Sequence, residues 1–291
     1  MSNVPIGVLL ALGTSACWAL GNVLTQKTGR LVGPPRAMLW SMAAGGVLAA
    51  PLALLLDERT APVTAAGAAY VAIAAVSGVV AYVGLFFAFA SESLTVAVPI
   101  VSSWPVVTAA VSFVLFGERV ARETLGGAAV VLLGVVLVSL GSQRADAPRH
   151  DAHASRRALA AGLASAVGFG VMIPAMAHVA PATGAFGATA AVYALGVVLG
   201  GIGARALGVD VRPPPRGTLT LVLATGAVES LGFVCVNLAR KFAPMTVVAP
   251  VATLSSTFTV IAAWAFLKER PGPRVLAGAA LACAGVVMLA R

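Results

Sequence analysis

Two stretches of the chain, 151 residues apart, decide the fold: TVAVPIVSSWPVVTAAVSFVLFGER at residues 95–119 and TVVAPVATLSSTFTVIAAWAFLKER at residues 246–270. Both stretches open on Thr-Val, carry Pro at their fifth position and close on Glu-Arg. Chance apolar composition explains matches of Ala and Val, but it does not easily explain paired Pro, Thr and Glu-Arg. The chain is therefore predicted to consist of two copies of one unit.

The composition predicts that lipid is the main solvent of the chain. Hydrophobic residues make up 59% of its 291 residues and charged residues only 10%, against roughly 25% charged in an ordinary soluble domain. The net charge of +9 does not indicate a nucleic-acid partner, because the basic residues lie at the edges of apolar blocks, as in membrane proteins. We expect a multi-pass protein of the inner cell membrane whose first apolar block is retained.

Apolar blocks of about 20 residues predict membrane-spanning helices, and the chain has enough for ten. The predicted spans are 4–26, 35–56, 65–90, 94–117, 123–140, 157–178, 184–204, 218–239, 245–267 and 274–290. We predict a first repeat at 1–143, a polar linker at 144–156 and a second repeat at 157–291. Because five is odd, the second copy enters the bilayer from the opposite face, so the all-α fold is an inverted repeat of two five-helix units.

Glu229 lies near the middle of the eighth predicted span, where an ionisable side chain costs roughly 2.5–3.5 kcal/mol to insert. It should therefore face the bundle interior and be protonated, paired with a base, or directed into a wet cavity. Phe233 and Asn237 share its helical face. The residue is a candidate for handling a substrate or a proton; the alternative is a structural hydrogen bond between helices.

The other candidate residues combine polar groups with aromatic rings on the first, third and fourth spans. The predicted substrate-binding set is Glu229, Asn237, Ser15, Trp18, Asn22, Tyr82, Ser103, Trp104 and Phe233. Ser and Thr can instead bond to their own backbone in apolar helices. Pro99 and Pro250 each remove a backbone donor and are predicted hinges, with a tolerated first-turn proline as the alternative.

No cofactor or metal is expected. Cys17, Cys235 and Cys283 lack metal-ligand spacing and are interpreted as small apolar residues rather than a disulfide framework. His150 and His153 in the linker have no third ligand beside them. The expected partners are a small-molecule substrate, with proton coupling as one option, and the lipid bilayer; the chain is expected to be a monomer or homodimer.

Several motifs resemble the EamA family of the drug/metabolite transporter superfamily. They are Trp104-Pro105-Val106-Val107, Gly117-Glu118-Arg119 with Gly126 and Gly134, and Leu267-Lys268-Glu269-Arg270 with Gly278 and Gly285. The resemblance covers nearly the whole chain and implies a ten-helix fold similar to that of bacterial exporters of amino acids and other metabolites. The chain departs from the family pattern at Ser256 and at Phe169-Gly170. No site residue is transferred from the family.

The leading hypothesis is a secondary active transporter that exports small organic metabolites by alternating access, and not an enzyme. The alternatives are a membrane-embedded lipid-modifying enzyme and an ion or divalent-metal pathway. The side of the termini stays open: 13 of the 19 Lys and Arg residues lie on the side opposite them, which favours termini outside the cytoplasm. The family resemblance implies termini inside.

Overall fold

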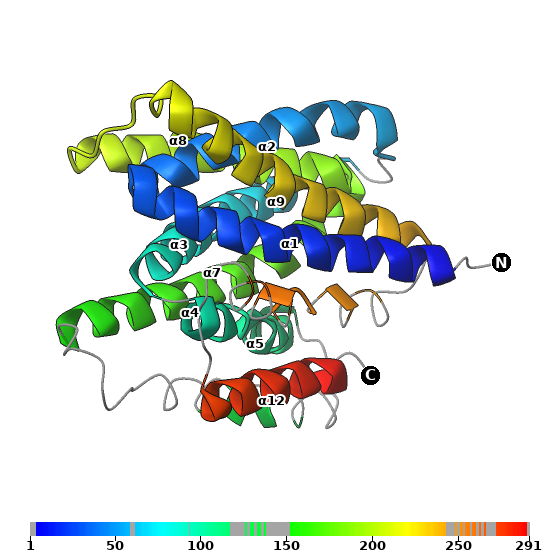
Figure 1. Ribbon diagram of the computed structural model, residues 1–291. Coiled ribbons are helices and arrows are strands. Elements are labelled where there is room, and N and C mark those ends of the chain that lie inside the picture. Colours follow the sequence, from blue (N-terminus) through cyan, green and yellow to red (C-terminus); the bar gives the residue numbers. More distant parts are fainter. Residues whose placement is uncertain are drawn as a thin grey trace.

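The computed structural model describes residues 4–58, 62–92, 94–116, 152–242 and 272–289, with isolated residues or short pieces between 126 and 137 and between 248 and 265. These described parts are helical, with short turns between the helices (Figure 1). The helices are α1 (Val4–Val32), α2 (Pro34–Leu56), α3 (Ala65–Ser91), α4 (Leu94–Val101), α5 (Trp104–Phe116), α7 (Ala152–Thr183), α8 (Ala185–Ala206), α9 (Arg216–Phe242) and α12 (Pro273–Leu289).

Six helices, α1, α2, α3, α7, α8 and α9, are long and apolar enough to cross a membrane. A helix satisfies its own backbone hydrogen bonds, which lipid cannot do. The prediction of an all-helical membrane protein is therefore confirmed. The predicted spans 123–140 and 245–267 lie mostly outside the described residues, and α12 is a shorter apolar helix at the predicted tenth span.

Two glycines, Gly33 and Gly184, connect the first and second helices of each repeat. They occupy equivalent positions of the two copies, and their φ angles are +86° and +79°. Each ends one helix and starts the next, between α1 and α2 and between α7 and α8. Because side chains other than hydrogen are strained at positive φ, this tight connection requires glycine at both places. It is a repeat feature that the sequence alignment alone did not identify.

The predicted span 94–117 is divided into α4 and α5 by a turn at Ser102–Ser103. The Ser103 N–H donates to the Ile100 carbonyl at 3.2 Å, and the Ser103 hydroxyl donates to the same oxygen at 2.8 Å. A serine hydroxyl that competes for backbone groups in this way disrupts a helix locally. The same short bond recurs at the equivalent position of the second repeat, where the Leu254 N–H donates to the Val251 carbonyl at 3.2 Å. The break is therefore another feature shared by the two repeats.

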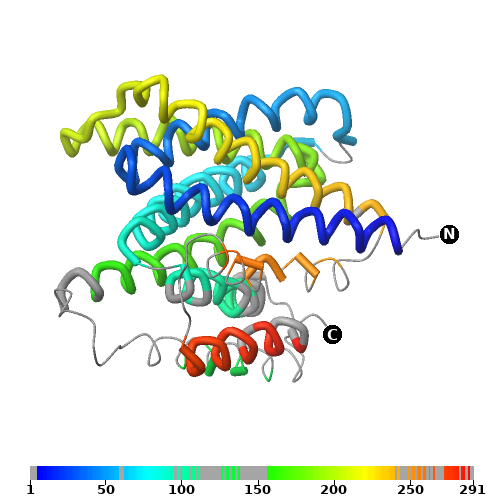
Figure 2. The backbone as a smooth tube through the Cα atoms, in the orientation of Figure 1, coloured from blue at the N-terminus to red at the C-terminus, as the bar shows by residue number. Residues whose placement is uncertain are grey.

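Helix α1 packs along α9 in the opposite direction (Figure 2). Gly13 lies against Cys235, and Gly21 lies against Glu229 further along the pair. We call this contact the α1–α9 interface. Since α9 is the third helix of the second repeat, this interface joins the two halves of the chain.

Helix α3 packs along α7, again in the opposite direction. Gly84 lies against the backbone of Ser165, and Gly168 lies against the backbone of Ala81. The repeat converts this α3–α7 interface into the α1–α9 interface, because it relates α1 to α7 and α3 to α9. Arg30, near the end of α1, donates to carbonyls at the end of α3, so α1 and α3 run in the same direction. Helices α1 and α7, the first helices of the two repeats, therefore run in opposite directions.

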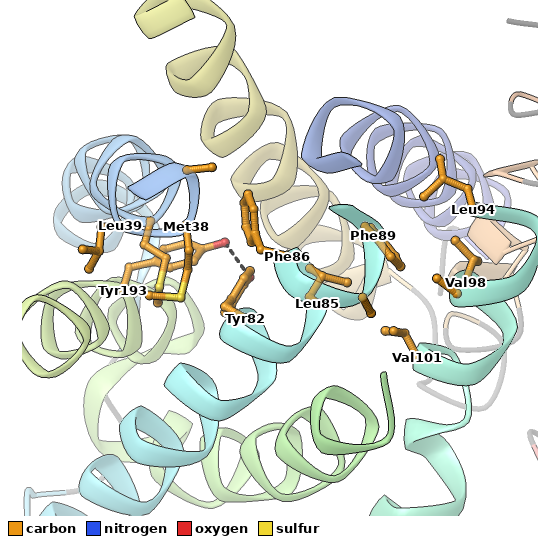
Figure 3. Packing of buried hydrophobic residues seen from close by; sticks show 14 of the residues in the cluster. Met38, Leu39, Tyr82, Leu85, Phe86, Phe89, Leu94, Val98, Val101 and Tyr193 are labelled. Atoms are coloured by element: carbon orange, nitrogen blue, oxygen red, sulfur yellow. Dashed lines mark hydrogen bonds between the residues drawn. The ribbon is translucent and has the colours of Figure 1, made fainter. Parts of the chain in front are cut away.

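The largest apolar core lies among α2, α3, α4 and α8. Its most buried large side chains include Met38, Phe86 and Phe89 (Figure 3). Tyr82 and Tyr193 belong to the same core, and their hydroxyl groups form a hydrogen bond of 3.1 Å. This core holds the second helices of both repeats together and forms one side of the centre of the bundle.

Candidate functional site

Five aromatic side chains form a continuous row through the centre of the bundle. Successive ring centroids lie 5.3 Å apart for Trp18 and Phe233, 6.3 Å for Phe233 and Tyr193, 5.9 Å for Tyr193 and Tyr82, and 5.3 Å for Tyr82 and Phe169. The five rings come from α1, α9, α8, α3 and α7. We call this set the aromatic row; its neighbouring rings lie at the separations typical of edge-to-face and tilted aromatic pairs.

The two ends of the aromatic row are related by the repeat. Trp18 is the counterpart of Phe169, and Tyr82 is the counterpart of Phe233, so the two pairs with a centroid separation of 5.3 Å are equivalent. Their interplanar angles are 65° and 70°, both of the edge-to-face kind. The aromatic row therefore follows the repeat symmetry of the two interfaces, with Tyr193 at its middle.

Glu229 enters this centre from α9. Its Oε1 atom is buried and has no hydrogen-bond partner, and the carboxyl lies in electrostatic range of Tyr82 and Tyr193. Among the described residues no basic side chain pairs with it, since their one ion pair joins Arg36 and Asp210. A buried carboxyl oxygen without a hydrogen-bond partner needs an explanation.

Two glycines make room for the polar side chains of the α1–α9 interface. A Cβ atom on Gly21 would lie 2.3 Å from Glu229 Oε1, and a Cβ atom on Gly232 would lie 2.4 Å from Trp18 Nε1. The two contacts are one helical turn apart on each helix. Trp18 Nε1, like Glu229 Oε1, is buried without a hydrogen-bond partner. A free donor and a free acceptor therefore lie close together on one interface.

The α3–α7 interface is built differently at the corresponding positions. Gly78 is the counterpart of Glu229, and it lies against the Met172 thioether at 3.2 Å from its would-be Cβ. The counterparts of Cys17 and Cys235 are Gly168 and Gly84, which lie against backbone atoms. The α3–α7 interface thus has close backbone contact and a thioether at the position where the α1–α9 interface has a carboxyl group.

Two further predicted residues, Ser15 and Asn22, connect α1 to the predicted ninth span. The Ser15 hydroxyl lies 3.1 Å from the Ala252 carbonyl, and the Asn22 amide donates to Thr259 Oγ1 at 2.9 Å. These groups hold α1 beside the segment that contains the second helix break. They are already partnered and therefore position α1.

The remaining predicted residues contact other parts of the chain. Ser103 bonds within its own turn, Trp104 begins α5 with its carbonyl beside Gly170 of α7, and Asn237 donates to the Ala185 carbonyl at 3.5 Å. Pro99 falls within α4, but its side chain lies outside the described residues, as does the whole of Pro250. The helix break lies three residues beyond Pro99.

The structure therefore brings Glu229, Trp18, Phe233 and Tyr82 together and adds residues that the sequence analysis missed. Tyr193 supplies the middle ring, and its signal was a single tyrosine within an apolar helix. Phe169 was noted only as a departure from the family pattern at the counterpart of Trp18. No group of three His, Cys, Asp or Glu side chains that could hold a metal occurs in the described part of the chain.

A membrane bundle made of two similar halves, with aromatic rings and a buried acid between them, is an arrangement found in multi-pass transport proteins. The chain belongs to the EamA-like transporter family, whose model matches residues 5–140 and 156–291. The two matches confirm the duplicated organisation, which is typical of the drug/metabolite transporter superfamily.

The fold has relatives among solved structures, of which 25 chains match. One, described as "Crystal structure of protein", aligns over 97% of this chain and 95% of its own, with a TM-score of 0.63 and 17% sequence identity. At that identity the likeness establishes the fold. No match was found among curated proteins.

Proposed function

We propose that the protein is a secondary active transporter that exports small organic metabolites across the inner cell membrane by alternating access. Ten spans in two inverted five-helix repeats would surround a substrate site at the aromatic row and Glu229. The observation that carries the proposal is the position of this centre between two interfaces that the repeat makes equivalent. Such symmetry provides two related ways to close a central site, one for each face of the membrane.

The antiparallel arrangement of α1 and α7 supports an inverted repeat. The helix breaks at Ser102–Ser103 and near Leu254 support it further, and the Ser256 hydroxyl donates to Ser102 Oγ at 2.7 Å, so the two breaks meet. Discontinuous helices in corresponding positions of two halves are typical of transporter substrate sites. The predicted hinges Pro99 and Pro250 lie beside these breaks in sequence.

The structural difference between the two interfaces suggests that they move differently during transport. Gly84 and Gly168 let α3 and α7 meet at their backbones, whereas the side chains of Cys17 and Cys235 lie between α1 and α9 at the same level. Separating α1 from α9 breaks fewer close backbone contacts. We assign opening toward one compartment to the α1–α9 interface, which also carries the unpartnered Trp18 Nε1 and Glu229 Oε1.

Glu229 is the proposed coupling residue. A carboxylate ion without a nearby cation is costly to bury, so an empty, closed centre favours a proton on Glu229. If substrate and proton bind to Glu229 in turn, each displaces the other, and the protein would exchange one for the other across the membrane. Proton-driven export follows from this competition.

The test is flux in proteoliposomes that contain the purified full chain. A panel of labelled amines, amino acids, sugars and nucleosides is offered with and without a pH gradient. We expect accumulation of at least one class only when the gradient is present. Glu229→Gln should abolish that dependence while the protein still elutes as a folded species, and Glu58→Gln, at an exposed position outside the helices, should behave as the unmodified chain. Unchanged, still gradient-dependent flux in Glu229→Gln would remove Glu229 from the mechanism.

A further inference from the structure

The charges of the described chain are distributed so that the interior contains an acid and the bases lie at the periphery. Every described Lys and Arg side chain is exposed except Arg36. Arg36 lies at the first turn of α2 and is bound to Asp210 and to the Arg212 carbonyl. A carboxylate, phosphate or sulfate group that reached Glu229 would therefore meet a negative or neutral centre without a described counter-charge.

The two unpartnered atoms indicate which hydrogen-bonding groups a bound molecule must carry. Glu229 Oε1 requires a hydrogen-bond donor, and Trp18 Nε1 requires an acceptor. The glycine contacts place these atoms one helical turn apart on the α1–α9 interface. One small molecule that carries both a donor and an acceptor on neighbouring atoms satisfies both.

The rings around Glu229 favour a positive charge on the donor. The faces of Trp and Tyr attract cations within about 6 Å of the ring centroid, and Trp18 belongs to the aromatic row beside Phe233. An ammonium group beside a carboxylate also removes the cost of an unpaired buried charge. The same rings provide an apolar surface for the remainder of the molecule.

Resting on the proposed function, we propose that the substrate is a protonated primary, secondary or tertiary amine with an aromatic or alkyl body and a neutral acceptor, such as a hydroxyl, near its nitrogen. Its N–H group donates to Glu229, and its acceptor receives the Trp18 N–H. Amino acids with a free carboxylate are disfavoured, because their negative group is brought toward Glu229. A quaternary ammonium ion is also disfavoured, because it has no N–H to donate.

Four compounds with the same aromatic body test this substrate class. Phenylalaninol has the amine and the hydroxyl, phenylalanine replaces the hydroxymethyl group with a carboxylate, 3-phenylpropanol lacks the amine, and 3-phenylpropionate is an anion. Binding to the full chain in detergent is measured by titration calorimetry, and flux of each compound is measured in proteoliposomes. We expect phenylalaninol to bind about 10- to 100-fold more tightly than the other three, as for a hydrogen bond to a charged group.

Variants assign the preference to the two atoms. Glu229→Gln should remove the advantage of phenylalaninol over 3-phenylpropanol, which a general loss of folding would not do selectively. Trp18→Phe keeps a ring and removes the N–H, so phenylalaninol should weaken several-fold while a plain phenylethylamine changes little. Trp40→Phe is the matched control, because Trp40 Nε1 donates to the Val211 carbonyl on the edge of the bundle.

Each outcome decides one of the two proposals. The amine site is overturned if phenylalanine or 3-phenylpropionate binds more tightly than phenylalaninol. It is also overturned if Glu229→Gln binds phenylalaninol as tightly as the unmodified chain does. Flux of any of these compounds would still support a transporter. Selective phenylalaninol binding without flux of any panel compound supports the amine site and overturns the proposed transport. Binding of none of the four compounds overturns the amine site.

Discussion

A methyl group at Gly21 tests whether the position of Glu229 matters for function. In Gly21→Ala the new Cβ atom would lie 2.3 Å from Glu229 Oε1, whereas ordinary contact begins at 3.4 Å. The carboxyl oxygen must therefore move by about 1.1 Å, the difference between these distances. The substitution changes neither the charge nor the length of Glu229, so it isolates the location of the carboxyl.

The expected change in stability is small because two effects oppose each other. Replacing glycine by alanine within a helix stabilises it by about 0.8–1 kcal/mol. Moving the flexible Glu229 side chain off its preferred rotamer costs about 0.5–1.5 kcal/mol. The net change in the free energy of unfolding should lie within about 1 kcal/mol of zero, whereas amine binding should weaken by about tenfold.

The assay combines thermal unfolding in detergent with amine titration and proteoliposome flux. Gly13→Ala on the same face of α1 is the control, because its Cβ would lie 3.5 Å from Cys235 Sγ, an ordinary contact. It should retain flux and gain stability. In a Glu229→Ala background the clash at Gly21 is gone, so Gly21→Ala should become stabilising by about 1 kcal/mol. Flux and affinity at the level of the unmodified chain in Gly21→Ala alone would refute the reasoning.

Four other substitutions or modifications have definite expected results. Gly226→Ala places a Cβ atom 1.9 Å from a backbone oxygen of α2 and should destabilise the fold by about 1–3 kcal/mol or more, while Gly201→Ala, with no atom within 4 Å, should stabilise it by about 0.5–1 kcal/mol; thermal unfolding measures both. Asp57→Ala removes the carboxylate that accepts two N–H groups at the start of α8 and should cost about 0.5–2 kcal/mol, measured in the same way. The thiols of Cys17 and Cys235 lie in hydrogen-bonding range, so mild oxidation should join them in a disulfide. Alkylation should then label one of the three cysteines, and flux should stop until the disulfide is reduced.

The outcomes that contradict these expectations are specific to each case. A neutral Gly226→Ala would mean that α2 and α9 can separate without loss. An Asp57→Ala variant as stable as the unmodified chain would show that the two N–H groups at the start of α8 gain no stability from the Asp57 carboxylate. Full flux in a protein with Cys17 and Cys235 joined would show that the α1–α9 interface does not open during transport, and Cys17→Ser controls for other effects of the oxidant.

The sequence was sufficient for the helices because hydrophobic length and breakers are local properties. The predicted spans 35–56 and 65–90 agree with α2 and α3 within a residue at each end. The prediction for the first span ended at 26, whereas α1 continues to Val32, because Arg30 lies on an exposed side and bonds to the end of α3. The charged residue Lys27, which follows the predicted end, therefore does not end the helix.

The centre could be predicted only in part because it depends on which helices meet. The insertion cost of a buried acid identified Glu229, and the helical period placed Phe233 beside it. Neither signal indicates that α8 contributes Tyr193 or that Asn237 bonds to the start of α8. The pairing of α1 with α9 depends on contacts such as Gly21 with Glu229, which are distant in sequence and have no local pattern.

Corresponding places in the two halves of the chain are filled in opposite ways. On one side a thioether from the first helix of a repeat, Met172, occupies the space beside Gly78; on the other a carboxyl from the third helix, Glu229, occupies the space beside Gly21. The architecture thus accepts a bulky group from either partner, and it does not demand that the group be ionisable. A chain with Gly21→Met and Glu229→Gly would have the same residue types at these positions in both halves and should fold as well as this one. Its centre would be neutral, however, and would not distinguish a charged molecule from an uncharged one.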